Sequence, residues 1–203
     1  MSHQNPVDLS GAAYFPAALD QAAQSALVED IRAILRVAPL VQPMTPSGKP
    51  MSVRMSAAGD YGWVTDRKGY RYQRRHPDGQ NWPAIPLSLS SLWQKYSNSE
   101  RAPQCCLVNW YGPEAKMGLH QDKDEADFQW PVVSVSLGDD GLFRIGQQTR
   151  GGSTDTIWLT SGDVVVMGGQ ARLIYHGVDR IRFGSSSLLP RNGRINLTLR
   201  VVI

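Results

Sequence analysis

Cysteine is scarce in this chain, and the two that occur are neighbours, Cys105 and Cys106. A closed structural zinc site uses four protein ligands and is usually rich in cysteine, so the chain cannot build a zinc site of that kind. Two adjacent cysteines also do not make a disulfide framework. The 203 residues suffice for one domain with a sizeable hydrophobic core.

Long apolar segments are missing as well, since no run approaches the roughly 20 residues needed to span a bilayer. The first residues, Met-Ser-His-Gln-Asn-Pro, lack the charged-then-apolar pattern of a secretory signal. Neither charge sign is in large excess, because 21 basic residues stand against 18 acidic ones. We therefore expect a cytoplasmic, monomeric protein in a reducing compartment, with no membrane partner.

Histidine is also scarce, and two of the four stand where metal ligands are expected. His3 lies in a polar arm and His76 in a basic loop. His120 opens the sequence His-Gln-Asp, so that His120 and Asp122 can bind one ion, and His176 follows later. Two imidazoles and one carboxylate with open positions are typical of non-haem Fe(II) oxygenases, in which a co-substrate and O2 reach the iron. Alone, His-x-Asp also fits a hydrogen-bonded histidine near a loop.

The C-terminal segment alternates between polar and apolar residues with a period of two. Its polar face carries Arg194, Asn196, Thr198 and Arg200, without an acidic residue. An ordinary half-buried strand with its polar face in water would alternate in the same way. Arginine, however, binds carboxylates through two parallel hydrogen bonds, and two arginines about 20 Å apart can clamp a small dicarboxylate. Beside Fe(II) ligands, such a clamp points to 2-oxoglutarate.

Basic and aromatic residues are interleaved in the first half of the chain. They are Arg67, Lys68, Arg71, Arg74 and Arg75, together with Trp63, Tyr70 and Tyr72. This mixture suits phosphate contacts combined with base stacking. A solvated charged hairpin would have the same composition, so both interpretations stay open on these residues alone.

Two helices and a series of strands are expected. Asp20 is a candidate N-cap for a helix with Leu27, Ile31, Ile34 and Leu35 at helical spacing. Pro83 and Pro86 introduce a second short helix through Leu89, Leu92 and Trp93. Residues 51–72 are expected to form strands joined by turns at Gly59-Asp60 and Lys68-Gly69. Further strands are predicted at 104–111, 131–137, 142–146, 154–159, 163–168, 171–175 and 194–203.

Short strands with Gly-rich turns predict a mainly β fold with flanking helices, of the double-stranded β-helix or jelly-roll barrel type. In such a barrel, the polar face of a strand can point inward at a site. This would explain why Arg194 and Arg200 share one face.

Several motifs in a fixed order resemble the bacterial AlkB proteins, Fe(II)- and 2-oxoglutarate-dependent dioxygenases that repair alkylated nucleobases. The motifs are His120-Gln-Asp-Lys-Asp124, Pro131-Val-Val-Ser-Val-Ser-Leu-Gly138, Gly162-Asp-Val-Val-Val, Tyr175-His-Gly177 and Arg194-Ile-Asn-Leu-Thr-Leu-Arg200, with Met51-Ser-Val, Gly62-Trp-Val-Thr and Gly69-Tyr-Arg-Tyr upstream. The resemblance runs from near Leu9 to the C-terminus. It implies one dioxygenase domain at 9–203, with a nucleotide-recognition lid at about 51–80 and the catalytic jelly-roll at 104–203. Residues 1–8 are polar and are expected to form a disordered arm.

The resemblance also implies a role for each site residue. The iron ligands would be His120, Asp122 and His176. Arg194 would bind the far carboxylate of 2-oxoglutarate, Arg200 would lie near its metal-chelating end, and Asn109, Tyr111 and Asn196 would hydrogen-bond it. Trp63 would stack on the damaged base opposite the His120 ring, and Tyr70, Tyr72, Asp124 and Arg150 would make further nucleotide contacts.

Two departures from the family pattern stand out. Met167 stands where bacterial relatives often have Trp, and the connection 182–190 is particular to this chain. Neither is expected to touch a ligand, but both can alter packing and substrate range.

The expected function is oxidative dealkylation of N-alkylated bases, such as 1-methyladenine and 3-methylcytosine, in single- or double-stranded DNA or RNA. By resemblance, Fe(II), 2-oxoglutarate and O2 take part, and an aldehyde, succinate and CO2 are released. The main alternative is a 2-oxoglutarate oxygenase acting on a protein or small molecule, which needs no Trp63 and no basic stretch. A non-catalytic nucleic-acid binder would have lost a metal ligand, and a cupin-like isomerase has no use for the paired arginines.

Overall fold

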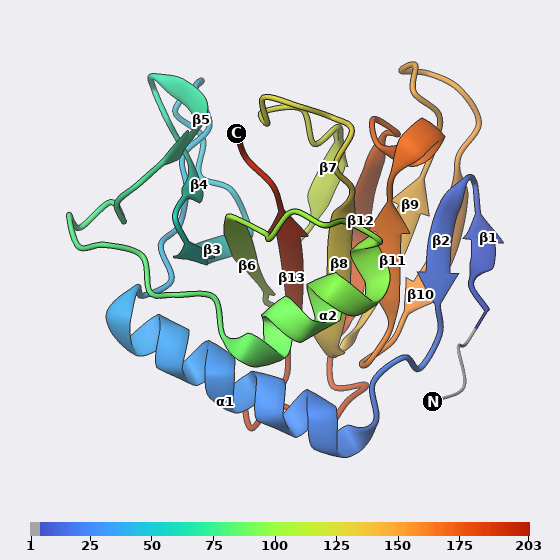
Figure 1. Ribbon diagram of the computed structural model, residues 1–203, viewed down its shortest axis with the longest axis horizontal. Coiled ribbons are helices and arrows are strands. Elements are labelled where there is room, and N and C mark those ends of the chain that lie inside the picture. Colours follow the sequence, from blue (N-terminus) through green and yellow to red (C-terminus); the bar gives the residue numbers. More distant parts are fainter. Residues whose placement is uncertain (1–4) are drawn as a thin grey trace.

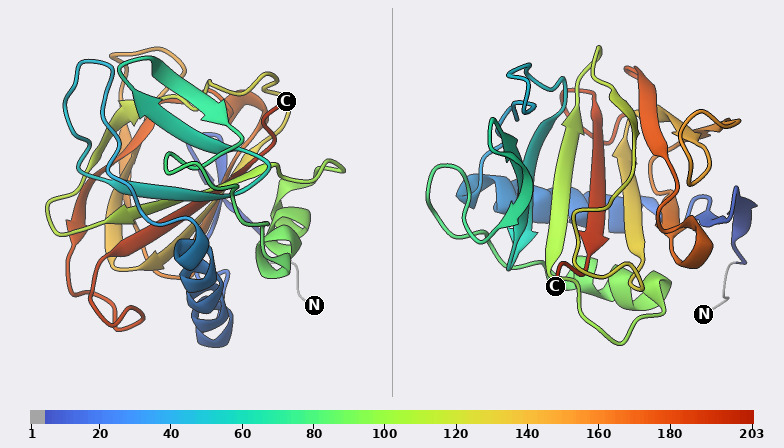
Figure 2. Two further views of the ribbon diagram at one scale, coloured as in Figure 1. Left: turned by 90° about the vertical axis from the view of Figure 1, so that its left-hand side faces the viewer. Right: turned by 90° about the horizontal axis from the view of Figure 1, so that it is seen from above.

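The computed structural model describes residues 5–203, which form two facing sheets, a separate hairpin and two helices (Figures 1 and 2). The seven-stranded sheet has the order β1-β2-β11-β8-β13-β6-β3, and the four-stranded sheet has the order β10-β9-β12-β7. The elements are β1 Val7–Leu9, β2 Ala12–Phe15, α1 Gln21–Val37, β3 Arg54–Gly59, β4 Gly62–Asp66, β5 Gly69–Gln73, α2 Leu87–Ser97, β6 Cys105–Tyr111, β7 Met117–His120, β8 Val132–Gly138, β9 Asp140–Ile145, β10 Asp155–Leu159, β11 Val164–Met167, the 3-10 helix Gly169–Ala171, β12 His176–Arg182 and β13 Arg194–Arg200. This is the expected jelly-roll arrangement.

Both predicted helices are present, and they cross the outer face of the seven-stranded sheet (Figure 1). The Asp20 carboxylate accepts a hydrogen bond from the backbone N–H of Ala23 at 2.8 Å, which caps α1 as expected. One face of α1 packs into a hydrophobic core through Leu27, Ile31 and Ile34. This core also contains aliphatic residues of β8, β11 and β13. The helices thereby cover one face of the large sheet and leave the other free to face the small sheet.

The alternation in β13 determines which side chains enter the barrel. Ile195, Leu197 and Leu199 pack into the core under the helices. Residues of opposite parity, from Arg194 to Arg200, line a pocket between the sheets. The expectation that the polar face of this strand points inward is confirmed.

The hairpin formed by β4 and β5 is a two-stranded sheet of its own, seen at the upper left of Figure 1. The chain turns where the sequence predicted, at Gly59-Asp60 between β3 and β4 and at Lys68-Gly69 between β4 and β5, and both glycines have positive φ. Figure 2 shows the hairpin beside the open end of the barrel. It is therefore placed to cover a site between the sheets.

The prediction of a strand at residues 171–175 is wrong, because no strand begins before His176 in this part of the chain. β11 ends at Met167, and Gly169 follows with a φ of +53°. Successive turns then occur, in which the Ala171 N–H donates to the Gly168 carbonyl and the Ile174 N–H to the Ala171 carbonyl. The strand begins at His176 instead and runs to Arg182. His176 is thus the first residue of β12.

The prediction for the N-terminal arm is wrong in part. Residues 1–4 of the predicted arm, with His3, lie outside the described residues, but Val7–Leu9 pairs with Ala12–Phe15 as an antiparallel hairpin. Ser10 and Gly11 both have positive φ in its turn, which is the geometry of a tight hairpin loop. The short strand β7, which ends at His120, was also not predicted. Within residues 5–203, no helix is long and apolar enough to cross a membrane.

Candidate active site

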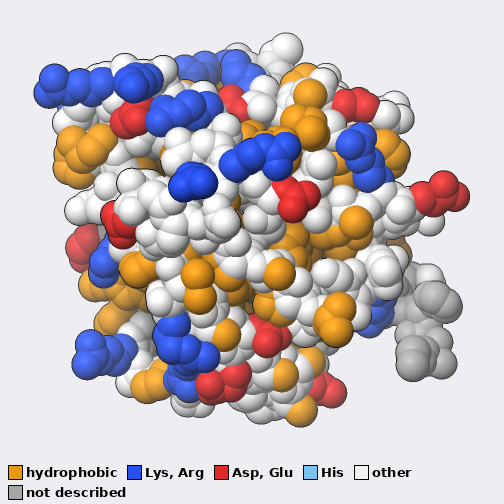
Figure 3. All heavy atoms as spheres, turned by 60° about the vertical axis from the view of Figure 1, so that its left-hand side comes forward, with side chains coloured by type: hydrophobic (Ala, Val, Ile, Leu, Met, Phe, Trp, Pro, Cys, Tyr) orange, Lys and Arg blue, Asp and Glu red, His pale blue; other side chains and the backbone are white. Residues whose placement is uncertain are grey.

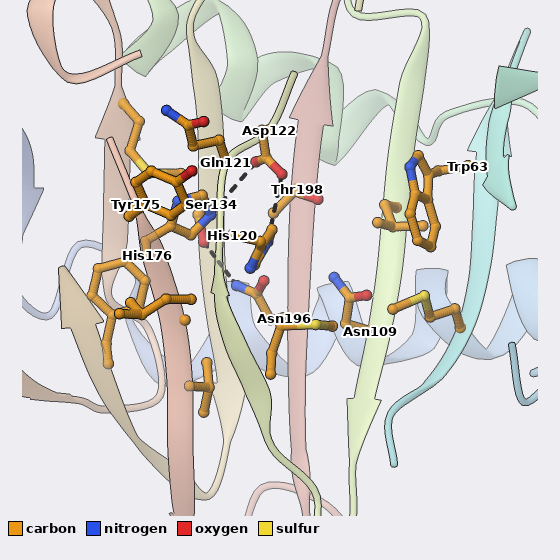
Figure 4. A pocket seen from close by; sticks show the side chains of 18 of the residues that line it. Trp63, Asn109, His120, Gln121, Asp122, Ser134, Tyr175, His176, Asn196 and Thr198 are labelled. Atoms are coloured by element: carbon orange, nitrogen blue, oxygen red, sulfur yellow. Dashed lines mark hydrogen bonds and ion pairs between the residues drawn. The ribbon is translucent and has the colours of Figure 1, made fainter. Parts of the chain in front are cut away.

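A pocket of about 410 Å³ lies between the two sheets and extends to the hairpin. Figure 4 shows its side chains converging from several strands. Every residue given a site role from the sequence lines this pocket except Tyr72: Trp63, Tyr70, Asn109, Tyr111, His120, Asp122, Asp124, Arg150, His176, Arg194, Asn196 and Arg200. The fold therefore brings together residues that are as far apart in sequence as Trp63 and Arg200.

His120, Asp122 and His176 form a cluster that could hold a metal ion, since their ligand atoms all lie within 4.8 Å of one another. His120 and His176 are paired across β7 and β12, and Asp122 follows two residues after β7 ends. The Nε2 atom of each histidine lies 3.7 Å from one carboxylate oxygen of Asp122. Figure 4 shows the three side chains turned toward a common region.

Both imidazoles are held in the orientation that a metal site requires. The Nδ1 atom of His120 lies 2.9 Å from the Gly118 carbonyl oxygen, and that of His176 lies 3.1 Å from the Ile174 carbonyl oxygen. An N–H at Nδ1 that donates to a carbonyl leaves Nε2 as the free acceptor. Burial, together with the neighbouring His120, lowers the pKa of His176 to about 4, so this imidazole is neutral near pH 7.

Asp122 is held as a carboxylate. Burial alone would raise its pKa, but Arg200 and then the two histidines hold the pKa well below its usual range. Arg200 Nη2 lies 2.9 Å from Asp122 Oδ2, yet this oxygen has no partner in hydrogen-bond geometry within residues 5–203. A buried carboxylate oxygen without a hydrogen bond is costly unless another group satisfies it, and a metal ion held between Asp122 and the two imidazoles would do so.

Arg194 is buried in the barrel, with 1% of its surface exposed. Its guanidinium donates to Ser136 Oγ at 2.7 Å and to the Leu159 carbonyl oxygen at 3.2 Å, while its Nε has no partner. No carboxylate within residues 5–203 lies at ion-pair distance from it. A buried arginine without a counter-ion fits an anionic ligand.

Amide and phenol groups lie between Arg194 and the metal cluster. Asn196 donates to Ser134 Oγ at 2.8 Å, and the buried Oδ1 of Asn109 has no partner among the described residues. Burial raises the pKa of Tyr111 to about 12, so its hydroxyl keeps its proton. These groups provide neutral donors and an acceptor between a lone cation and a metal site, which suits an extended dicarboxylate.

Gly141 supplies a test of the Arg194 position. A Cβ at Gly141 would lie 2.8–3.0 Å from the Nε, Cδ and Cζ atoms of Arg194, so Gly141→Ala must displace this side chain. A displacement of about 1 Å costs on the order of 100-fold in function, and we expect at least a tenfold rise in the KM for 2-oxoglutarate. Titration of Mn(II) binding is the control, because Gly141 touches no member of the metal cluster. An unchanged KM would mean that no ligand depends on the position of Arg194.

The hairpin side of the pocket contains the predicted stacking residue. The indole N–H of Trp63 donates to Asp124 at 2.7 Å, and the Tyr70 ring stacks on it at 5.5 Å with an interplanar angle of 17°. Figure 4 shows Trp63 across the pocket from His120. Arg150 lies over the Tyr175 ring at the pocket wall.

Three features of the site were not foreseen. Glu125 and Arg172 are buried and form an ion pair at 3.1 Å beside Asp122, and Arg200 has acidic partners from this segment although its own strand has none. Three acidic residues within four positions, Asp122, Asp124 and Glu125, were the sequence signal that could have indicated these ion pairs. Met167, which was given no site role from the sequence, lines the pocket.

The comparisons with known proteins agree with this geometry. Residues 11–200 match the family model described as the 2OG-Fe(II) oxygenase superfamily. The alpha-ketoglutarate-dependent dioxygenase AlkB homolog of Caulobacter vibrioides (strain NA1000 / CB15N) is 53% identical over 187 residues, which cover 92% of this chain and 85% of that protein. The chain is an AlkB-family dioxygenase.

Two further relatives extend the comparison. The alpha-ketoglutarate-dependent dioxygenase AlkB of Escherichia coli (strain K12) is 41% identical over 179 residues, covering 86% of this chain and 82% of that protein. The solved structure of OsALKBH1 superposes with a TM-score of 0.79 at 30% identity and covers 98% of both chains. As a 2OG-Fe(II) oxygenase, the AlkB-type chain uses Fe(II), 2-oxoglutarate and O2.

Proposed function

We propose that this chain removes alkyl groups oxidatively from N-alkylated nucleobases in DNA or RNA. The observation that carries the proposal is the space between the Trp63 indole and the His120 imidazole, which lies directly beside the metal cluster (Figure 4). An aromatic platform facing an imidazole accepts the flat face of an extruded base. An alkyl group on such a base would then face the metal.

The proposed metal ligands are His120, Asp122 and His176. When bound, the iron and its co-substrates supply the oxidising power, and the alkyl carbon leaves as an aldehyde while 2-oxoglutarate becomes succinate and CO2. Arg194 would hold the far carboxylate of 2-oxoglutarate, and Arg200 would lie near the chelating end. Asn109, Tyr111 and Asn196 would hydrogen-bond the co-substrate between them.

The rim of the pocket supports a polyanionic substrate. Arg67 and Lys68 are exposed at the hairpin turn, and Arg74 stacks on the Tyr61 ring at 4.7 Å. Arg71 is already paired with Asp66 at 2.8 Å. Figure 3 shows Lys and Arg side chains gathered along the upper part of this face. Basic side chains beside aromatic ones suit a single strand or a flipped nucleotide in a duplex.

Around the base, Tyr70, Asp124 and Arg150 would contact the nucleotide, since all three line the pocket beside Trp63 or at its wall. The names of relatives agree with this substrate class: a Schizosaccharomyces pombe protein is a tRNA demethylase, and Arabidopsis thaliana relatives are DNA N(6)-methyladenine demethylases. We further propose that the enzyme acts as a cytoplasmic monomer, where a reducing environment keeps iron as Fe(II).

Trp63→Ala tests the stacking role. An aromatic platform contributes about 1–3 kcal/mol per base, so the affinity for a methylated oligonucleotide should fall by roughly 5- to 150-fold. Trp63→Phe is the matched control, because it keeps a ring while it removes the hydrogen bond to Asp124. Fluorescence anisotropy with a labelled oligonucleotide measures both variants.

The same two variants separate stacking from a structural role. If Trp63 only fills the core, its removal would cost about 3–5 kcal/mol of stability. A large drop in melting temperature with unchanged affinity per folded molecule would refute the stacking role.

The substrate class is tested by formaldehyde release. Oligonucleotides that carry 1-methyladenine or 3-methylcytosine, as DNA and as RNA, should release formaldehyde only when Fe(II) and 2-oxoglutarate are present. A panel of methylated peptides serves as the comparison. Turnover of a peptide in preference to every oligonucleotide would favour the alternative of a protein-directed oxygenase.

A further inference from the structure

Two buried arginines and two buried carboxylates form a network next to the metal cluster. Arg200 contacts Asp122 at 2.9 Å and Glu125 at 3.0 Å, and Arg172 contacts Glu125 at 3.1 Å. Arg172 also donates to the Asp122 carbonyl oxygen at 2.6 Å. The position of the Asp122 carboxylate therefore depends on Arg200 and, behind it, on Glu125 and Arg172, which do not line the pocket.

Tyr72 joins this network from the hairpin. Its hydroxyl donates to Glu125 Oε1 at 2.5 Å and accepts a hydrogen bond from Arg200 Nη1 at 3.0 Å. Burial raises the pKa of Tyr72 well above its ordinary value, so the hydroxyl keeps the proton that it donates. Tyr72 does not line the pocket. With its hydroxyl engaged in this way, the residue suits a structural link better than a contact to the nucleotide.

The hairpin contacts the segment that follows Asp122 at two neighbouring residues, Asp124 and Glu125. Trp63 and Tyr72 are directly opposite each other across β4 and β5. Trp63 bonds Asp124, and Tyr72 bonds the next residue, Glu125. These carboxylates follow Asp122 by only two and three residues. Among the described residues the hairpin shares no ladder with the other sheets. Its inner face packs through Val64 against Ala57 and Leu107, and the bonds of Trp63 and Tyr72 add the polar link to the segment after Asp122.

We propose that Tyr72 is a positioning residue that ties the hairpin to Arg200 and Glu125, so that the seated hairpin holds the Arg200 guanidinium against Asp122. Trp63, which would receive the substrate, is then linked through Tyr72 to Arg200, which contacts Asp122 at the metal and co-substrate end of the site. The proposal rests on the proposed function only in that a nucleic acid is the ligand that engages the hairpin.

Tyr72→Phe removes the hydroxyl and keeps the ring. We expect 2-oxoglutarate to bind Mn(II)-loaded Tyr72→Phe about tenfold more weakly, which is ~1.4 kcal/mol, with no nucleic acid present. The stimulation of 2-oxoglutarate decarboxylation by a methylated oligonucleotide should also fall about tenfold. Tyr96→Phe is the matched control, because Tyr96 packs on Phe15 away from the pocket. Thermal melting of both variants corrects each value to the folded fraction.

A double-variant cycle adds a test that does not depend on turnover. If Tyr72 acts through Glu125, then combining Tyr72→Phe with Glu125→Gln should weaken 2-oxoglutarate binding little more than Glu125→Gln alone. Additive losses would overturn the link between the two residues.

Two other outcomes would also overturn the proposal. Unchanged 2-oxoglutarate affinity and unchanged stimulation in Tyr72→Phe would show that the network does not need the hydroxyl. A loss confined to oligonucleotide affinity would make Tyr72 a direct nucleotide contact instead. Should wild-type protein show no stimulation by any oligonucleotide, the proposed substrate class fails, while the Mn(II)-loaded binding measurement still decides on Tyr72.

Discussion

His120→Ala is expected to abolish turnover, and Asp122→Ala and His176→Ala are expected to do the same. Each variant removes one of the three proposed metal ligands, and a three-ligand site has no other protein group to replace the one that is lost. The loss should exceed the roughly 10- to 100-fold that removal of an outer partner of a metal ligand costs. His120→Ala is the cleanest of the three, since 40% of the His120 side chain is exposed and its loss leaves no buried cavity.

Metal titration and thermal melting separate the causes of inactivity in these variants. His120→Ala should melt near the wild-type temperature without metal and should lose the stabilisation that added Mn(II) confers. Asp122→Ala also removes a partner of the buried Arg200, so a lower melting temperature is expected there. Near-normal activity with Fe(II) in any one of the three variants would refute the assignment of that ligand.

Arg194→Lys is expected to raise the KM for 2-oxoglutarate by roughly 10- to 150-fold, because a lost hydrogen bond to a charged group costs about 1.5–3 kcal/mol. The guanidinium is fixed by Ser136 and by the Leu159 carbonyl, and an ammonium group cannot reproduce its planar pair of donors. Steady-state kinetics at saturating O2 measure the effect, with Arg182→Lys as the control because Arg182 stacks on Trp158 outside the pocket. If Arg194→Lys keeps the wild-type KM, the far carboxylate is bound elsewhere.

The inward face of β13 could be predicted because two independent patterns agreed. The alternation fixed which residues share a face, and the chemistry of the arginines argued that this face looks into a site. His120 and Asp122 could be predicted to lie together because they are two residues apart, whereas their meeting with His176 depends on the pairing of β7 with β12. Asp20 could be foreseen as a cap because its role depends on residues three positions away.

The parts that sequence reasoning missed depend on contacts that no local pattern reveals. Glu125 lies in a segment with several acidic residues and resembles a solvated position, yet Arg172 and Arg200 bury it completely. Residues 171–175 have the composition of a strand, but the positive φ of Gly169 turns the chain before a ladder can form. Ser10-Gly11 was a recognisable turn signal, whereas the pairing of β2 with β11 depends on a partner distant in sequence.

The central claim is that the space between Trp63 and the metal cluster receives an alkylated base whose alkyl carbon is oxidised. The ratio of formaldehyde to succinate, measured in one reaction with a 3-methylcytosine oligonucleotide, tests this claim most directly. A tightly coupled reaction should give a ratio near one for the wild type, and Trp63→Ala should lower it while succinate production without oligonucleotide stays the same. Succinate formation without any formaldehyde across methylated DNA and RNA oligonucleotides would contradict the claim.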